Sequence, residues 1–171
     1  MVITSDIRLR GTDWDTVLNG YKDIFQTRLN YQMFILCTAI GIMYDKRIEV
    51  PEENGEEDKS VPRNVIRNND NGKLDFMFQA AVLTTTTDNY TEEQRLDLAF
   101  GDEKQDFSKI NYLLEFANYG AKILAGKMGD TTLETMNNLK DFLESSVEGR
   151  NFDIDALPDD ILLDNGLDGE Q

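Results

Sequence analysis

The chain contains no histidine in its 171 residues. Histidine is the commonest general base and a frequent zinc ligand, so its absence excludes the Ser-His and Cys-His nucleophile pairs and nearly all zinc chemistry. There is one cysteine, Cys37, which rules out an internal disulfide and suits a reducing cytosol. Because Cys37 lies in an apolar segment, we interpret it as a small core residue and not as a nucleophile. We therefore expect a protein that is not an enzyme and that binds no cofactor or metal.

Long apolar runs are also missing. The longest spans residues 31–44 and is interrupted by Gln32 and Thr38. A run of 14 residues is too short to cross a bilayer, which takes about 20 apolar residues. No charged segment followed by an apolar one opens the sequence as a secretory leader would. We expect a cytoplasmic protein without a membrane partner.

Basic residues are scarce, with 17 Lys and Arg against 33 Asp and Glu, and the net charge is −16. Three stretches hold all of this charge: residues 49–59 carry −5, residues 92–106 carry −4, and residues 151–171 carry −7. The first stretch contains an acidic patch made of Glu52, Glu53, Glu56 and Glu57. Since so acidic a chain repels phosphate, we expect the protein alone not to bind duplex DNA.

Most apolar residues recur at helical spacing. A helix that begins near Thr27 and ends near residue 45 is apolar on all sides, which is typical of a buried central helix. Residues 107–125 form the clearest helix, and Gly126 stops it. Its apolar stripe consists of Ile110, Leu113, Leu114, Ala117, Ala121 and Leu124. Residues 1–10 fit either an arm or a short strand, and residues 47–61 are predicted to be an exposed loop.

Two capping boxes mark the starts of further helices. Thr91 and Gln94 have the spacing at which a hydroxyl and an amide each accept a hydrogen bond from the other residue's backbone N–H. Thr131 and Glu134 repeat that spacing. The helix that this second pair opens is predicted to bury Leu133, Met136, Leu139, Leu143 and Val147. The β-branched run 84–87 is predicted to end an earlier helix, with a strand as the alternative.

These elements predict an all-α fold. We expect a compact helical domain over residues 1–150, arranged around the buried central helix and carrying acidic loops, followed by an acidic C-terminal tail over residues 151–171. A chain of this length fits one domain and buries roughly two thirds of its unfolded surface.

The tail admits two interpretations. Charge of one sign favours a simple disordered segment. An apolar thread runs through the acids, however, and an acidic chain of this kind suits docking on a basic, apolar groove of a partner. The candidate partner-binding residues in the thread are Phe152, Ile154, Leu157, Ile161, Leu162 and Leu163.

Two segments resemble a known family. Residues 24–41 read IFQTRLNYQMFILCTAIG, and residues 115–124 read EFANYGAKIL. They resemble the DNA phosphorothioation-associated (Dnd system-associated) small accessory proteins of bacterial defence loci, which have a similar Phe-x-[Thr/Ser] start to a buried helix and a Glu-Tyr-Ala-Asn-Gly-Gly signature. Tyr119 replaces the first glycine of that signature, and the acidic stretch 49–59 and the tail are additional. The resemblance spans about residues 20–126 and implies a defence context, with no catalytic residue to transfer.

Two functions follow as hypotheses. The first is a non-catalytic accessory or scaffold subunit of a prokaryotic anti-phage or DNA-modification-linked defence complex, which works through protein–protein contacts with a larger nuclease or ATPase subunit. The alternative is an acidic DNA mimic that blocks a basic DNA-binding groove. A mimic requires acids at phosphate-like spacing on one face, whereas an accessory subunit requires an apolar contact surface.

Overall fold

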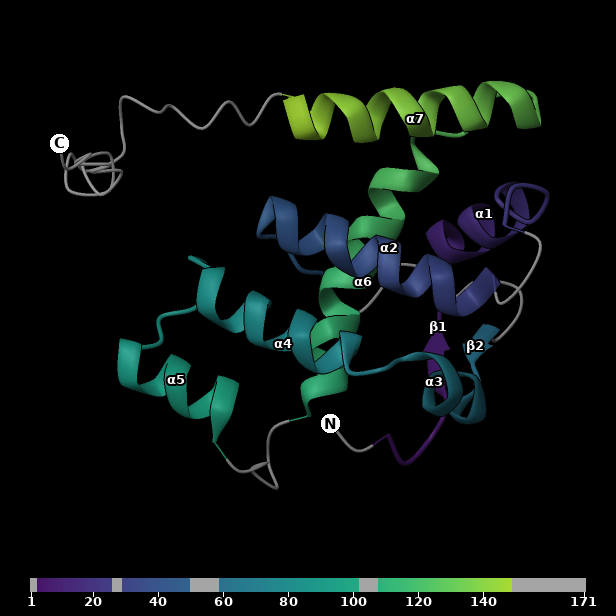
Figure 1. Ribbon diagram of the computed structural model, residues 1–171. Helices are drawn as coiled ribbons and strands as arrows, with labels where there is room; N and C mark the ends of the chain where they lie inside the picture. Colours follow the sequence, from purple (N-terminus) through teal and green to yellow (C-terminus); the bar gives the residue numbers. More distant parts are fainter. Residues whose placement is uncertain (1–2, 26–28, 50–58, 102–107, 149–171) are drawn as a thin grey trace, which may run out of the picture.

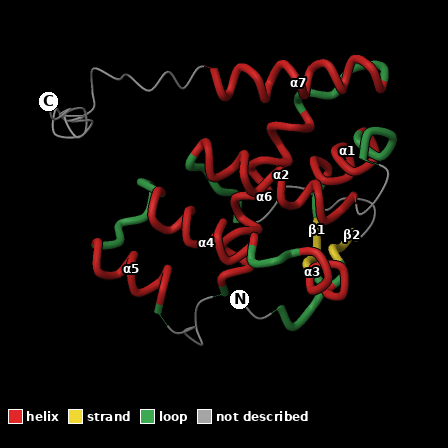
Figure 2. The backbone as a smooth tube through the Cα atoms, in the orientation of Figure 1, coloured by secondary structure: helices red, strands yellow, loops and turns green. Residues whose placement is uncertain are grey.

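The computed structural model describes residues 3–25, 29–49, 59–101 and 108–148. Within them the chain forms mainly helices, as Figure 2 shows. In chain order the elements are β1 (Ile7–Leu9), α1 (Thr12–Gly20), α2 (Leu29–Tyr44), β2 (Lys59–Val61), α3 (Arg63–Asn69), α4 (Lys73–Thr84), α5 (Glu92–Phe100), α6 (Lys109–Ala125) and α7 (Thr132–Glu148) (Figure 1). The predicted all-α class is confirmed, because the strands found among the described residues form only one small two-stranded sheet.

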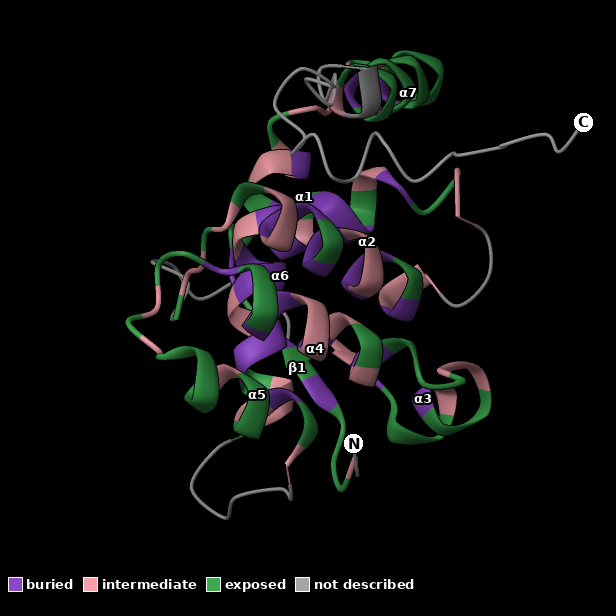
Figure 3. Ribbon diagram, turned by 60° about the vertical axis from the view of Figure 1, so that its left-hand side comes forward, coloured by how far each residue is buried: buried purple, intermediate pink, exposed green. Residues whose placement is uncertain are grey.

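The centre of the fold is the pair α2 and α6, which pack on each other more extensively than any other two elements (Figure 1). The predicted central helix is α2, which buries Met33, Phe34, Cys37 and Ile40 completely or nearly so. Its apolar surface extends around the helix because other elements, α1, α4 and β2 among them, also contact it. The burial map in Figure 3 shows buried residues on α6 and α2, whereas α5 and α7 are mostly exposed.

Local sequence signals determine where several helices begin. Both hydrogen bonds of the capping box at α5 are present, between Thr91 and Gln94. At α7 only half of the predicted box forms: the Glu134 N–H donates to the Thr131 hydroxyl at 3.2 Å, but the Glu134 carboxylate accepts from the Asp130 N–H instead. Helix α4 ends at Thr84, so the β-branched run ends the helix as predicted and forms no strand.

The two strands join segments that are far apart in the sequence. β1 and β2 pair antiparallel, with Ile7 opposite Val61 and Leu9 opposite Lys59. Alternation along β1 buries Ile7 and Leu9 and exposes the residue between them. Residues 1–10 therefore contain the short strand that was one of two alternatives. The prediction of a loop over 47–61 was wrong at its end, because Lys59–Val61 pairs with β1.

Helix α7 differs from its prediction. Leu139 is buried, but Leu133, Met136 and Leu143 are exposed by 63%, 46% and 40%. Phe142, which was not among the predicted core residues, is buried instead. The side chain of Val147 lies outside the described residues. The helix stands across the end of α6 and makes only sparse contact with the other elements (Figure 1), so a single buried row suffices to attach it.

Candidate functional site

Most residues singled out from the sequence lie outside the described part of the structure. The acidic patch Glu52, Glu53, Glu56 and Glu57 falls in residues 50–58, and the whole apolar thread of the tail falls in residues 149–171. Their predicted roles therefore stay predictions. The described residues instead present a polar groove and several exposed apolar rows.

The polar groove lies between the first turn of α1, the segment 45–49 that follows α2, and the middle of α6. Its hollow has a volume of about 730 Å³ and is lined by charges of both signs. The charged lining residues are Arg10, Asp13, Asp45, Lys46, Arg47, Glu49, Glu115 and Lys122. Such a mixture of charges suits polar contacts more than an apolar ligand.

Arg47 organises one wall of the polar groove. Its guanidinium forms an ion pair with Asp88, lies 3.5 Å from a carboxylate oxygen of Glu115, and stacks 4.9 Å from the ring centroid of Tyr112. The Tyr112 hydroxyl donates to the other Asp88 oxygen at 2.7 Å. Burial alone lowers the pKa of Arg47, but the carboxylates of Asp88 and Glu115 outweigh it and raise that pKa, so the guanidinium stays charged.

Glu115, a carboxylate of this wall, has a raised pKa. Partial burial raises the pKa of Glu115, the nearby Glu49 and Asp88 add to the rise, and Arg47 opposes it. Burial, followed by the hydrogen bond to Asp88, also raises the pKa of Tyr112. A carboxylic acid with a raised pKa beside a groove is a common feature of functional sites, but structural ion-pair networks also raise the pKa of their acids.

Asn118 fastens the floor of the polar groove. Its Oδ1 accepts from the Trp14 indole N–H at 2.9 Å, and its Nδ2 donates to the Ile48 carbonyl at 3.0 Å. The Ile48 N–H in turn donates to the backbone carbonyl of Glu115 at 3.0 Å. One buried amide thus joins α1, α6 and the segment after α2. In the sequence, Glu115 and Asn118 stood out only as members of the segment 115–124, with no role attached to either.

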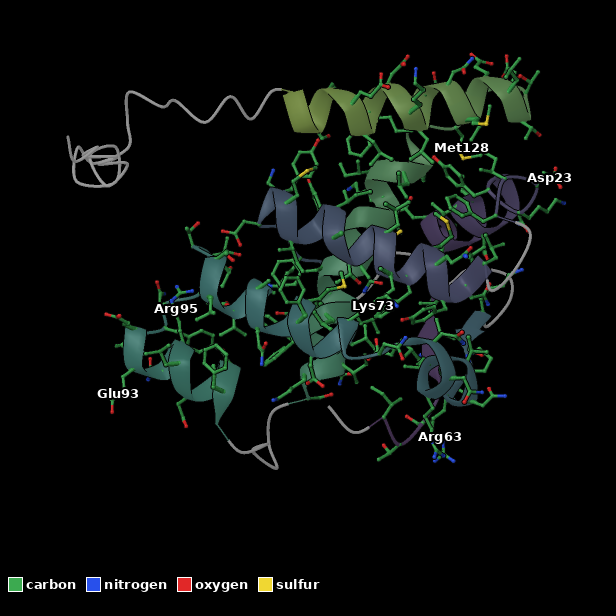
Figure 4. All side chains as sticks on the ribbon, in the orientation of Figure 1. Asp23, Arg63, Lys73, Glu93, Arg95 and Met128 are labelled. Carbon is green, nitrogen blue, oxygen red and sulfur yellow. The ribbon has the colours of Figure 1, made fainter. Side chains whose placement is uncertain are left out.

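Asp45 ties the same segment to the turn that follows α4. It adopts a left-handed backbone with φ of 50°, and its carboxylate accepts from the Thr86 N–H and hydroxyl, both at 2.6 Å, and from the Thr85 hydroxyl. Partial burial raises the pKa of Asp45, but these hydrogen bonds outweigh it and lower that pKa overall. Arg95 extends from α5 and donates to the carbonyls of Val82, Thr85 and Asp88 in the same region (Figure 4).

These contacts show what the polar groove can do chemically. Within residues 3–25, 29–49, 59–101 and 108–148, every buried side-chain nitrogen and oxygen has a hydrogen-bond partner. The same residues contain no group of three or more potential metal ligands. The polar groups of the inner wall therefore form a structural network in which they bond to one another. The exposed Lys46 and Lys122 and the half-exposed Tyr119 lie at the rim of the groove. The Lys46 ammonium lies 5.7 Å from the Tyr119 ring centroid.

Cys37 lies deep in the interface of α2 and α6. Its side chain is fully buried, and this burial raises the pKa of the thiol far above its ordinary value. A thiol of this kind is neutral and out of reach, whereas a nucleophilic cysteine is ionised and partly exposed.

In the described part of the chain, large apolar side chains are exposed on four helices: one on α2, where Tyr44 is 42% exposed, and two or more on each of α4, α5 and α7. Phe76 is 70% exposed on α4, and Leu83 follows it two turns later. Leu96 and Phe100 lie one turn apart on α5, with exposures of 47% and 63%. On α7, Leu133, Met136 and Leu143 complete the set. A second, apolar hollow of about 410 Å³ adjoins Phe76, between α2 and α4. Single exposed apolar residues are ordinary, but rows of them mark contact surfaces.

No helix in the described part of the chain is both long and apolar enough to cross a membrane. Comparison of the chain with protein-family models, with curated proteins and with solved structures gives no match. Its function must therefore be inferred from its own residues.

Proposed function

We propose that this protein is a non-catalytic accessory or scaffold subunit that works through protein–protein contacts in a prokaryotic anti-phage or DNA-modification-linked defence complex. The observation that carries the proposal is the set of exposed apolar rows on α4, α5 and α7. Each row lies on a helix whose other face packs on the core, so each presents apolar surface to solvent.

The remaining chemistry of the chain agrees with a binding role. The one cysteine is buried, and the charged wall of the polar groove is engaged in its own ion pairs and hydrogen bonds. The apolar thread of the tail supplies a second candidate contact, made of Phe152, Ile154, Leu157, Ile161, Leu162 and Leu163. The resemblance of residues 24–41 and 115–124 to small accessory proteins of defence loci supports the defence context and a larger nuclease or ATPase as the partner.

The test begins with the partner. The tagged full-length protein is purified from its native cells, co-purifying proteins are identified by mass spectrometry, and the complex is rebuilt from recombinant components. Affinity is then measured across a salt series, with and without competing duplex DNA. We expect a shallow dependence on salt and no competition by DNA, because apolar burial dominates a scaffold interface. A steep salt dependence with complete competition by DNA would establish the DNA mimic instead.

Substitutions assign the contact. Phe76→Ser combined with Phe100→Ser should weaken the rebuilt complex about tenfold, since exposed aromatic anchors carry much of the energy of an interface. Gln32→Ser, at an exposed polar site on α2, serves as the matched control. In the tail, Leu162→Asp or Leu163→Asp should weaken binding more than changing Glu52, Glu53, Glu56 and Glu57 together to Gln. The reverse order would favour the mimic.

A further inference from the structure

Helix α5 carries an apolar pair that the described part of the chain leaves uncovered. Leu96 and Phe100 lie one helical turn apart and are exposed by 47% and 63%. A different face of the helix packs inward, where Ala99 is buried and Leu98 is half-buried. Figure 3 shows that most of the surface of α5 is exposed. The apolar pair is therefore presented to solvent.

Local contacts fix the rotation of α5 about its axis. The capping box formed by Thr91 and Gln94 orders its first turn. The Arg95 guanidinium donates to the carbonyl of Val82 in α4 at 2.8 Å and to two carbonyls of the turn that follows α4. In Figure 4, Arg95 extends toward α4, whereas Glu93 points away from the body of the molecule. These contacts hold the apolar pair on the outer side.

The neighbours of the apolar pair on the helix surface are acids. Side chains three or four residues apart are neighbours on an α-helix. Glu92 and Glu93 have this spacing to Leu96, and Asp97 has it to Phe100. At about 100° per residue, Glu92 lies on one side of the pair, and Glu93 and Asp97 lie on the other. Because all three acids are exposed, the pair has a negative border on both sides.

The one base of α5 does not cancel this border. Arg95 lies about 100° around the helix from Leu96, on the inner side, where its guanidinium is bound to backbone carbonyls. No ion pair among the described residues involves Glu92 or Glu93. Beyond the helix, the sequence of residues 102–106 holds three acids and one base. The outer face of α5 therefore has a net negative charge.

The other exposed apolar rows lack such a border. On α4, the charged residue at neighbour spacing to Phe76 is Lys73. On α7, Lys140 lies at neighbour spacing to both Met136 and Leu143. A basic side chain beside an apolar row repels a basic partner, whereas acids attract one. Charge therefore distinguishes α5 as the row that suits a basic partner.

Other occupants conflict with the acids of α5. Nucleic acids and anionic membranes would bring phosphates against them. The tail of this chain, residues 151–171, carries −7 without a single Lys or Arg. A second copy would bring the same acids on its own α5 and a further charge of −16. Like charges so juxtaposed disfavour binding, so a cationic segment of another protein is the occupant that fits.

We infer that the outer face of α5 docks a basic amphipathic helix of another protein, in which apolar side chains one turn apart are bordered by Lys or Arg. Its apolar side chains pack on Leu96 and Phe100, and its bases meet Glu92, Glu93 and Asp97. The apolar contact supplies most of the affinity and the exposed charges orient the partner, which agrees with a shallow dependence on salt. This inference rests on the proposed function, because it names the chemistry of one contact of an accessory subunit.

A synthetic probe tests the apolar contact with the full-length protein. The probe is a fluorescent peptide with leucines one helical turn apart, bordered by lysines. It is compared with a peptide in which every lysine is replaced by glutamate, and with a scrambled peptide of the same composition. Fluorescence anisotropy should show saturable binding of the first peptide only. Leu96→Ser combined with Phe100→Ser should weaken that binding about tenfold, while Phe76→Ser, at an equally exposed site on α4, should leave it unchanged.

A second pair of variants tests the negative border. Glu92→Gln combined with Glu93→Gln should weaken binding of the lysine peptide about threefold, since exposed ion pairs each contribute little. Asp141→Asn combined with Glu144→Gln removes the same charge from exposed sites on α7 and should leave binding unchanged. The measurements are made at about 0.1 M salt, where distant charges are largely screened. Far-UV circular dichroism checks that each variant is folded.

Each other result overturns the inference in a recognisable way. Absence of saturable binding removes the docking face, equal binding of the scrambled peptide reduces the contact to net charge, and equal binding of the glutamate peptide removes the role of charge. An equal loss in the α7 charge variant would move the attraction away from α5. A concentration-dependent dimer in sedimentation that is lost in the Leu96→Ser, Phe100→Ser variant would make a second copy the occupant. A gain in peptide affinity on deletion of residues 151–171 would make the tail the occupant.

The native complex separates this inference from the proposed function. If the complex forms but tolerates Leu96→Ser together with Glu92→Gln and Glu93→Gln, the inference fails while the proposed function stands. If no protein co-purifies with the full-length chain, the proposed function fails with it.

Discussion

Gly41 and Gly120 are the two points at which the central helices touch backbone to backbone. A Cβ atom on Gly41 of α2 would lie 2.1 Å from the carbonyl oxygen of Phe116 in α6. A Cβ atom on Gly120 of α6 would lie 1.9 Å from the carbonyl oxygen of Cys37 in α2. Each helix thus contributes the small residue that the other helix requires, and the distance between their axes is set by this reciprocal contact.

Alanine at either glycine should destabilise the fold. The added methyl group collides with backbone, which cannot rotate away as a side chain can, so Gly41→Ala and Gly120→Ala should each lower the free energy of unfolding by about 1–3 kcal/mol or more. Urea denaturation followed by far-UV circular dichroism measures this. Gly126→Ala is the control, because a Cβ there meets nothing closer than 3.5 Å. Equal stability of all three variants would show that α2 and α6 are not in backbone contact.

Two adjacent leucines of α6 should respond differently to truncation. Leu113 is fully buried, whereas Leu114 is only half-buried. Leu113→Ala should therefore lower the free energy of unfolding by about 2–5 kcal/mol, since it leaves a cavity, and Leu114→Ala should lower it clearly less. Urea denaturation of the two variants gives the comparison, and a larger loss at Leu114 would mean that α6 is rotated relative to the described packing.

Removing Arg47 should expose its coupling to Asp88. The two side chains are exposed by 23% and 12%, so Arg47→Met should cost about 1–3 kcal/mol of stability, mainly because Asp88 loses a charged partner while partly buried. Asp88→Asn in the Arg47→Met background should then cost less than it does alone. A double-mutant cycle of unfolding free energies measures the coupling. Strict additivity of the two substitutions would contradict the ion pair.

The hydrogen bonds of Asp45 should appear as a dependence of stability on pH. Its folded-state pKa lies below its ordinary value, so its carboxylate stabilises the fold above the unfolded-state pKa, about 3.9, and this contribution is lost as the pH falls through the lower folded-state pKa. Asn tolerates the left-handed backbone at this position. Asp45→Asn should therefore be less stable than the native chain at neutral pH.

The difference between Asp45→Asn and the native chain should begin to shrink below about pH 4, where Asp45 of the unfolded chain takes up a proton while the folded carboxylate is still ionised, and the decline should be complete once the pH is below the folded-state pKa. Melting temperatures measured across a pH series give this result. Asp23→Asn, which removes an exposed carboxylate after α1, is the matched control (Figure 4). A difference that stays constant down to low pH would mean that the Asp45 charge does not contribute.

The central helices could be predicted because their signals are local. α2 occupies Leu29–Tyr44, close to the expected helix, and α6 occupies Lys109–Ala125, with four of its six predicted stripe residues buried. Ile110 and Leu114 are half-buried, since the buried face of α6 also includes Tyr112 and Phe116. Helical spacing defines a face only to within a residue or so, and packing chooses its centre.

The polar groove could not be predicted, because its partners are distant in the sequence. Arg47 and Asp88 are 41 residues apart, and Trp14 and Asn118 are 104 apart. Neither pair has a spacing signature, since such contacts follow from how helices pack. The prediction of the buried residues of α7 was wrong for a related reason. Periodicity predicts that a face of a helix is apolar, but not whether the rest of the molecule covers that face.

Trp14 gives the protein an optical reporter of its own. It is the single tryptophan of the chain, it is 1% exposed, and its indole N–H bonds to the amide that also holds Ile48. Indole emission shifts to longer wavelengths in more polar surroundings, so light from this one ring records whether α1 remains docked on α6. Any molecule that enters the polar groove and displaces Asn118 will shift the tryptophan emission maximum of the unlabelled protein.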